Sequence, residues 1–134
     1  EESAVVAPCD GTTDSALSAT GPILAAHPDV DHWVVYSCND DGMLGAPNAL
    51  GNAGFVPGDV IGAGLGAYEA CRPWKEGLET GFRSALFASG RAVGEVAARV
   101  LADSIRSGGP LPAETIAPTQ IVGPDTWEAI MSCG

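Results

Sequence analysis

The sequence predicts an α/β fold, a parallel sheet with helices on both faces. Short apolar, β-branched segments alternate with helix-forming segments at least four times along the 134 residues. Hydrophobic residues make up 46% of the chain and charged residues 17%, a composition that can bury a core. Right-handed crossovers place every strand-to-helix turn of such a sheet on one rim, where ligands bind.

The first half of the chain is predicted to form a strand at 4–7, a helix at 12–26, a strand at 32–38 and a helix at 40–52. Thr12 can cap the first helix, which we expect to be interrupted near Gly21 and Pro22. The segment HWVVYSC is continuously apolar, as in a strand that is buried on both faces.

The second half is predicted to form strands at 60–64, 80–87 and 115–122, and helices at 68–77, 90–106 and 124–131. The helix at 90–106 has the clearest pattern, because its apolar residues recur at helical spacing. These residues are Val93, Val96, Ala97, Val100, Leu101 and Ile105. The turn that begins at Gly108 ends this helix.

The net charge of −11 argues against nucleic acid as a partner, because an acidic chain repels phosphates. No apolar run approaches the roughly 20 residues of a membrane span, so we expect no membrane insertion. No signal peptide is recognised within the chain.

The four cysteines match no zinc-binding spacing, and they permit two disulfides in three pairings or four free thiols. Cys71 with Cys133 is the first pair to test. Cys9 and Cys38 follow predicted strands and lie on the ligand rim, but a missing strand between them would keep them apart.

Gly62, Gly64 and Ala67 fit the dinucleotide pattern G-x-G-x-x-G/A. The next strand does not end in an acid that could bind ribose hydroxyls, so glycines that permit a tight turn explain the pattern better. Glu69 lies just past the strand and could accept a hydrogen bond from a neutral hydroxyl. Tyr68 could cover the face of a sugar ring, or it could belong to the core, and Trp74 leaves the same choice open.

The segment after the strand at 32–38 is polar. Asn39 offers both donors and an acceptor, which suits a polyhydroxylated ligand. The alternative is that Asn39 or Asp40 caps the following helix, and one residue could do each. The histidines and aspartates of HPDVDHW lie on the opposite rim and are interpreted as a polar turn, so no metal site is expected. No G-x-S-x-G nucleophile elbow occurs, and no enzymatic activity is expected.

Several spaced features together resemble one family: HPDV-x-HW, then ND, LG, GF, D-x-IG-x-G and TGF. In this order they are similar to the C-terminal half of type I periplasmic monosaccharide-binding proteins, and most of all to the arabinose-binding branch. The resemblance covers nearly all of the chain. Family members are about twice as long, so the chain resembles an incomplete C-terminal lobe.

The resemblance implies a solute-binding component of an ABC sugar transporter, with an arabinose- or galactose-like monosaccharide held between two lobes. Asn39 matches a family asparagine that binds sugar hydroxyls. Cys38 stands where the arabinose branch has methionine, Glu69 where it has aspartate, and Gly66 where it has asparagine. The expected ligand-binding residues are Cys38, Asn39, Asp40 and Glu69, with no cofactor.

The resemblance also implies an organisation in three parts. Residues 1–86 would form part of the sugar-binding lobe, 87–112 would pack on an absent N-terminal lobe, and 113–134 would return. Expected partners are the membrane subunits of the transporter and the missing lobe or a second chain, in the periplasm or outside the cell. Alternatives are the sensor core of a sugar-responsive repressor and a flavodoxin-like nucleotide-binding enzyme.

Overall fold

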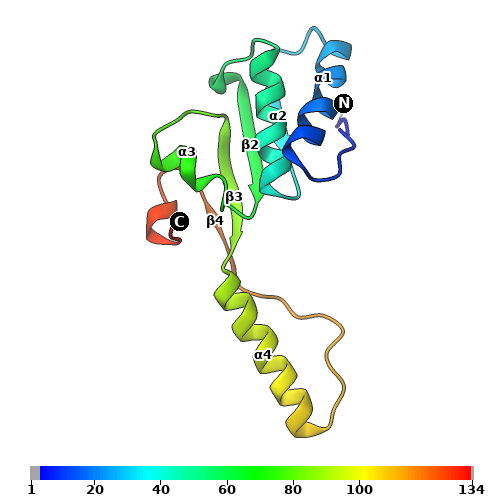
Figure 1. The fold of residues 1–134 in the computed structure, drawn as a ribbon, viewed down its shortest axis with the longest axis vertical. Coiled ribbons are helices and arrows are strands. Elements are labelled where there is room, and N and C mark those ends of the chain that lie inside the picture. Colours follow the sequence, from blue (N-terminus) through cyan, green and yellow to red (C-terminus); the bar gives the residue numbers. More distant parts are fainter. Residues whose placement is uncertain (1–3, 134) are drawn as a thin grey trace.

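The computed structural model describes residues 4–133 and has the predicted mixed α/β architecture (Figure 1). Residues 1–3 and 134 lie outside the described part. They belong to the predicted units 1–86 and 113–134, respectively. The elements in order are α1 (Thr13–Ala26), β1 (Trp33–Tyr36), α2 (Asp40–Asn52), η1 (Pro57–Asp59), β2 (Val60–Leu65), α3 (Cys71–Lys75), β3 (Phe82–Ala88), α4 (Gly90–Ser107), β4 (Thr119–Val122) and η2 (Trp127–Ala129).

Within residues 4–133 a single sheet has the strand order β1-β2-β3-β4. The first three strands are parallel, as predicted, but β4 runs antiparallel to β3 with Val122 opposite Ala85. A fully parallel sheet was therefore the wrong prediction at this strand. The chain leaves β3 at the rim, extends along α4 and returns from the same side, so that β4 enters the sheet where β3 ended (Figure 1).

The described helices that cover the sheet pack on one face rather than on both. Met43 of α2, Trp74 of α3 and Trp127 of η2 share a buried cluster with Ala85 and Val122. Right-handed connections between successive neighbouring strands place each helix on the same side, which explains the difference from the prediction. The other face exposes apolar side chains: Val34, Tyr36, Ile61, Leu65, Leu86 and Ile121.

The glycines of β2 leave room for core side chains from α2 and from β3. A Cβ at Gly62 would lie 2.6 Å from Met43 Cε, and one at Gly64 would lie 2.6 Å from Phe82 Cζ. The sequence interpretation of a tight turn was therefore incorrect at these two positions, which belong to a strand. The space that a side chain would need is filled by core residues.

Several predicted elements differ from the structure. The predicted helix at 68–77 is limited to Cys71–Lys75, and the predicted strand at 115–122 to Thr119–Val122. Residues 4–7 form no strand, because no neighbouring strand pairs with them in the described part of the chain. Helix α1 continues through Pro22. Proline removes only one amide donor from the helix, and the packing of α1 against α2 through Ala16, Thr20 and Leu24 offsets that loss. The predicted helix at 124–131 is shortened to the turn η2 (Trp127–Ala129), which a hydrogen bond from the amide of Ile130 to the carbonyl of Trp127 closes.

The predicted cysteine pair is confirmed. Cys71 at the start of α3 is bonded to Cys133, with their Cα atoms 5.7 Å apart. This disulfide attaches the C-terminal segment to the helix layer. Cys9 and Cys38 are exposed thiols.

Helix α4 confirms the predicted helix at 90–106, but it extends away from the sheet (Figure 1). Ser89 caps its first turn, and Gly108 ends it with a positive φ of 67°. Among the described residues, α4 contributes none to a buried core. Neither α4 nor any other helix in residues 4–133 combines the length and apolarity needed to cross a membrane.

Candidate functional site

The candidate site lies on the rim where β1, β2 and β3 end. Since these strands are parallel, the loop after β1 and the loop after β2 meet there. The backbone amide of Glu69 donates to Asp40 Oδ2 over 3.1 Å, which joins segments 29 residues apart in the chain. The structure therefore brings the two predicted polar loops together at the end of the sheet from which α4 extends (Figure 1).

Asn39 caps α2, as one of the two sequence alternatives proposed. Its Oδ1 accepts from the amide of Gly42 over 3.0 Å. Its Nδ2 donates to the carbonyl of Gly11 over 2.6 Å. The second Nδ2 hydrogen has no acceptor among the described residues, so the side chain retains one donor for a ligand.

Gly11 is a site neighbour that the sequence did not indicate. Its φ of +88° favours glycine, and a Cβ there would lie 3.2 Å from Asn39 Nδ2. Asp10 shapes the same turn, since its carboxylate accepts from both the hydroxyl and the amide of Thr12. These hydrogen bonds stabilise the ionised form and hold the pKa of Asp10 below its ordinary value.

Asp40 is the buried acid of the rim, with 6% of its surface exposed. Its Oδ1 accepts from the amide of Ala67 over 2.9 Å, in addition to the Oδ2 bond from Glu69. Ala67 has a φ of +70°, which is unusual for a residue with a side chain, and it is fully buried. The carboxylate of Asp40 therefore holds the loop after β2 in a strained conformation.

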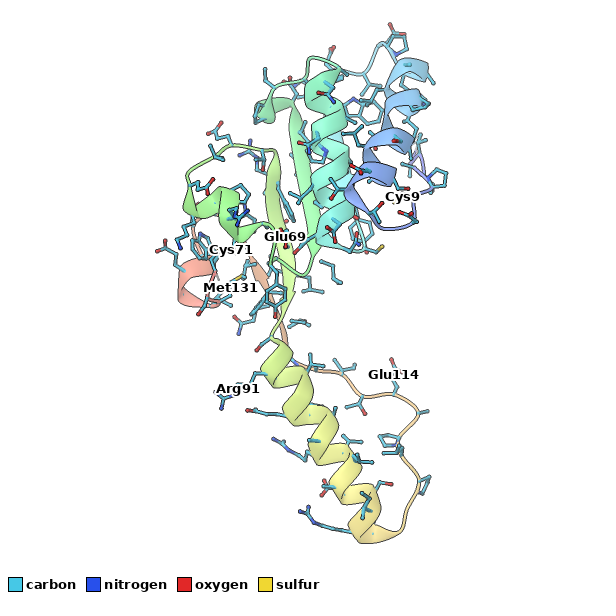
Figure 2. All side chains as sticks on the ribbon, in the orientation of Figure 1. Cys9, Glu69, Cys71, Arg91, Glu114 and Met131 are labelled. Carbon is cyan, nitrogen blue, oxygen red and sulfur yellow. A yellow bond between two sulfur atoms is a disulfide. The ribbon has the colours of Figure 1, made fainter. Side chains whose placement is uncertain are left out.

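Glu69 presents an exposed carboxylate at the rim, close to the N-terminal end of α2 (Figure 2). Across residues 4–133, its side chain takes part in none of the observed hydrogen bonds or ion pairs, whereas its backbone is fixed by Asp40. Cys38, from the neighbouring loop, is also exposed. Both side chains are accessible to a ligand.

The two aromatic candidates have different environments. Trp74 belongs to the core, where its Nε1 donates to the carbonyl of Phe82 over 2.9 Å. Tyr68 is half exposed, and its ring packs edge-on against Phe87. The Tyr68 hydroxyl donates to the carbonyl of Ala88 over 3.3 Å and accepts from the amide of Gly90 over 3.2 Å.

The described residues contain no cluster of three or more metal-ligating side chains. Two hollows lie around Leu17, Pro47 and Phe55 and around Leu24 and Pro28, at the opposite end of the strands. The rim that carries Asn39 and Glu69 belongs to neither hollow. It is an open, polar edge that can form hydrogen bonds with hydroxyl groups from one side.

Comparison with known proteins finds relatives along most of the chain. An ABC transporter L-arabinose-binding periplasmic protein from Azospirillum brasilense is 35% identical over 122 residues, which are 89% of this chain and 36% of that protein. The L-arabinose-binding periplasmic protein of Escherichia coli K12 is 34% identical over 74 residues, 55% of this chain and 22% of that protein. No protein-family model matches.

A solved structure is also similar to this chain over most of its length. A periplasmic ribose ABC transporter protein from Conexibacter woesei superposes with a TM-score of 0.69 and 27% identity. The match covers 92% of this chain and 40% of that one. The chain thus spans 36% or less of the length of the arabinose-binding relatives, and it corresponds to a part of such proteins.

Proposed function

We propose that this chain is part of the solute-binding component of an ABC sugar transporter, because its homologues and structural neighbours are periplasmic sugar-binding proteins of such transporters. The proposed ligand is a monosaccharide of the arabinose class. The observation that carries this proposal is that the loops with Asn39 and Glu69 lie on one rim. The parallel pairing of β1 with β2 brings these loops together, and the amide of Glu69 donates to Asp40.

The proposed role is binding without chemical conversion. The Glu69 carboxylate would accept hydrogen bonds from sugar hydroxyls, and the remaining hydrogen on Asn39 Nδ2 would donate one. Cys38 would contact the ring from the side. A site that bonds individual hydroxyls disfavours sugars that lack them, because its own polar groups are then left unpaired.

The proposed organisation has one sugar-binding lobe and an extension. Residues 4–86 and 113–133 would belong to the same lobe, which is supported by the pairing of β4 with β3 and by the Cys71–Cys133 disulfide. Residues 87–112 would extend to a second lobe or a second chain, since the apolar stripe of α4 is exposed. The disulfide also supports export to an oxidising compartment.

Titration of the chain with L-arabinose, D-galactose and D-ribose tests the proposal. We expect L-arabinose to shift the amide resonances of Asn39 and Glu69 before those of the opposite rim. Glu69→Gln should weaken binding roughly tenfold, as expected for the loss of a charge-assisted hydrogen bond. Glu128→Gln, which removes an exposed acid from η2, is the matched control. Binding that is unchanged in Glu69→Gln, or that shifts no rim resonance, would contradict the proposal.

A further inference from the structure

We propose that Asp40 is a positioning residue, whose carboxylate fixes the turn at residues 66–69 so that Glu69 faces the ligand and Tyr68 reaches the base of α4. This inference rests on the proposed function for the role of Glu69. It differs from the sequence expectation that Asp40 itself contacts the sugar. The buried carboxylate already accepts two backbone hydrogen bonds, from Ala67 and Glu69, and these direct it toward the turn.

Asp40 is not needed as the cap of α2. The adjacent Asn39 accepts from the amide of Gly42 and performs that role. The carboxylate of Asp40 instead bonds amides that lie 27 and 29 residues further along the chain. Its place in the first turn of α2 also favours a negative charge, because the helix dipole is positive there. The acid is thus stabilised by α2 while it acts on another loop.

The turn needs an external support. Gly66 and Ala67 both have positive φ values, 128° and 70°. The second is unfavourable for a residue with a Cβ and persists only where surrounding contacts determine it. A Cβ at Gly66 would lie 2.8 Å from Asp40 Oδ2, so the carboxylate packs directly beneath this backbone. These contacts make Asp40 the group that determines the direction of Glu69.

The same turn reaches the junction between β3 and α4. The Tyr68 hydroxyl lies between the carbonyl of Ala88 and the amide of Gly90, the first residue of α4. Helix α4 contributes no buried side chain among the described residues, so its direction depends on contacts at its base. A ligand that fixes Glu69 therefore acts next to Tyr68, whose hydroxyl joins β3 to α4.

Amide exchange in the full chain tests the positioning role without any sugar. Asp40→Asn removes the charge and one acceptor but retains the shape, and we expect the amides of Ala67 and Glu69 to exchange about tenfold faster or more. Asp40→Ala should have a larger effect at both positions. Asp41→Asn is the matched control, because Asp41 is an exposed acid in the same helical turn.

The proposal is overturned if both amides keep their protection in Asp40→Ala, or if Asp41→Asn has an equal effect. It is also overturned if both Asp40 variants accelerate exchange equally throughout the sheet. Asp40 would then be a residue of general stability and not of this turn.

Titration with L-arabinose completes the test. Asp40→Asn should weaken binding about tenfold, and the double variant with Glu69→Gln should bind no more weakly than Glu69→Gln alone. Independent, additive losses would show that Asp40 does not act through Glu69 and would overturn the proposal. If the wild-type chain binds no sugar while the exchange results hold, the proposed function fails and the positioning of the turn stands.

Tyr68→Phe tests the link to α4. The amide of Gly90 should exchange faster in this variant, while the exchange of Ala67 is unaffected. Unchanged exchange at Gly90 would refute the link.

Discussion

Two regions of the molecule are stabilised in different ways: the sheet with its helix layer, and helix α4. Both regions carry amphipathic patterns. Met43 and Leu50 of α2 are almost fully buried, whereas Leu101 and Ile105 of α4 are 51% and 73% exposed. The apolar stripe of α4 is the most regular in the sequence. An amphipathic pattern thus specifies a helix and its apolar face, but it does not specify the surface that covers this face.

The contacts that hold the two regions differ accordingly. The helix layer depends on long-range contacts, which include the Cys71–Cys133 bond across 62 residues. Helix α4 depends on local interactions: the Ser89 cap, the Gly108 terminus and exposed pairs such as Arg91–Glu95 at 2.8 Å. Changes to long-range contacts should therefore alter global unfolding, and changes in α4 should remain local.

Loss of the disulfide should have the largest effect. Cys71→Ser with Cys133→Ser releases a loop of 62 residues, and the chain-entropy relation gives a loss of about 4 kcal/mol in the free energy of unfolding. Thermal and urea unfolding, monitored by circular dichroism, measure this loss. The matched control is Cys9→Ser with Cys38→Ser, because both thiols are exposed. Equal losses in the two variants would show that the bond does not stabilise the helix layer.

Gly64→Ala tests how tightly the core packs against β2. The added Cβ would lie 2.6 Å from the ring of Phe82, so the core must shift, at a cost of about 2 kcal/mol. Urea unfolding measures this cost. If the variant is as stable as the wild type, the β2 glycines are not required for packing.

The same substitution in α4 should have the opposite sign. Outside the local helix backbone, no atom of the described residues lies within 4 Å of the Cβ position at Gly94, so Gly94→Ala relieves the helix-interior cost of glycine, up to about 1 kcal/mol. The expected result is slower amide exchange within α4, with no change in the exchange of β2. A destabilised α4 would mean that another surface contacts Gly94 closely.

The sequence predicted elements that depend on local pattern. The bounds of α2 match the prediction, and α4 is one residue longer at its C-terminal end than the predicted 90–106. Such elements are determined by neighbouring residues, caps and terminating glycines. The direction of β4 could not be predicted, because it depends on where the segment after α4 returns to the sheet.

The candidate site divides in the same way. The common rim of Asn39 and Glu69 followed from the parallel sheet, and the cap formed by Asn39 from its position before a helix. The two partners of Asp40 could not be predicted, because no local signal links this residue to amides 27 and 29 residues away. The positive φ of Ala67 could likewise not be predicted from the sequence, since alanine carries no turn signal.

Leu101→Lys should have the smallest effect on folding and the clearest effect on association. Leu101 is half exposed and lies outside both buried clusters, so the substitution should change the free energy of unfolding by less than about 0.5 kcal/mol. An exposed apolar stripe favours association, and a lysine within it should reduce any concentration-dependent increase in mass seen by analytical ultracentrifugation. Arg99→Lys, which keeps the charge on the exposed helix, is the control. A large loss of stability in Leu101→Lys would show that α4 packs on the chain itself, and the contrast between the two regions would be wrong.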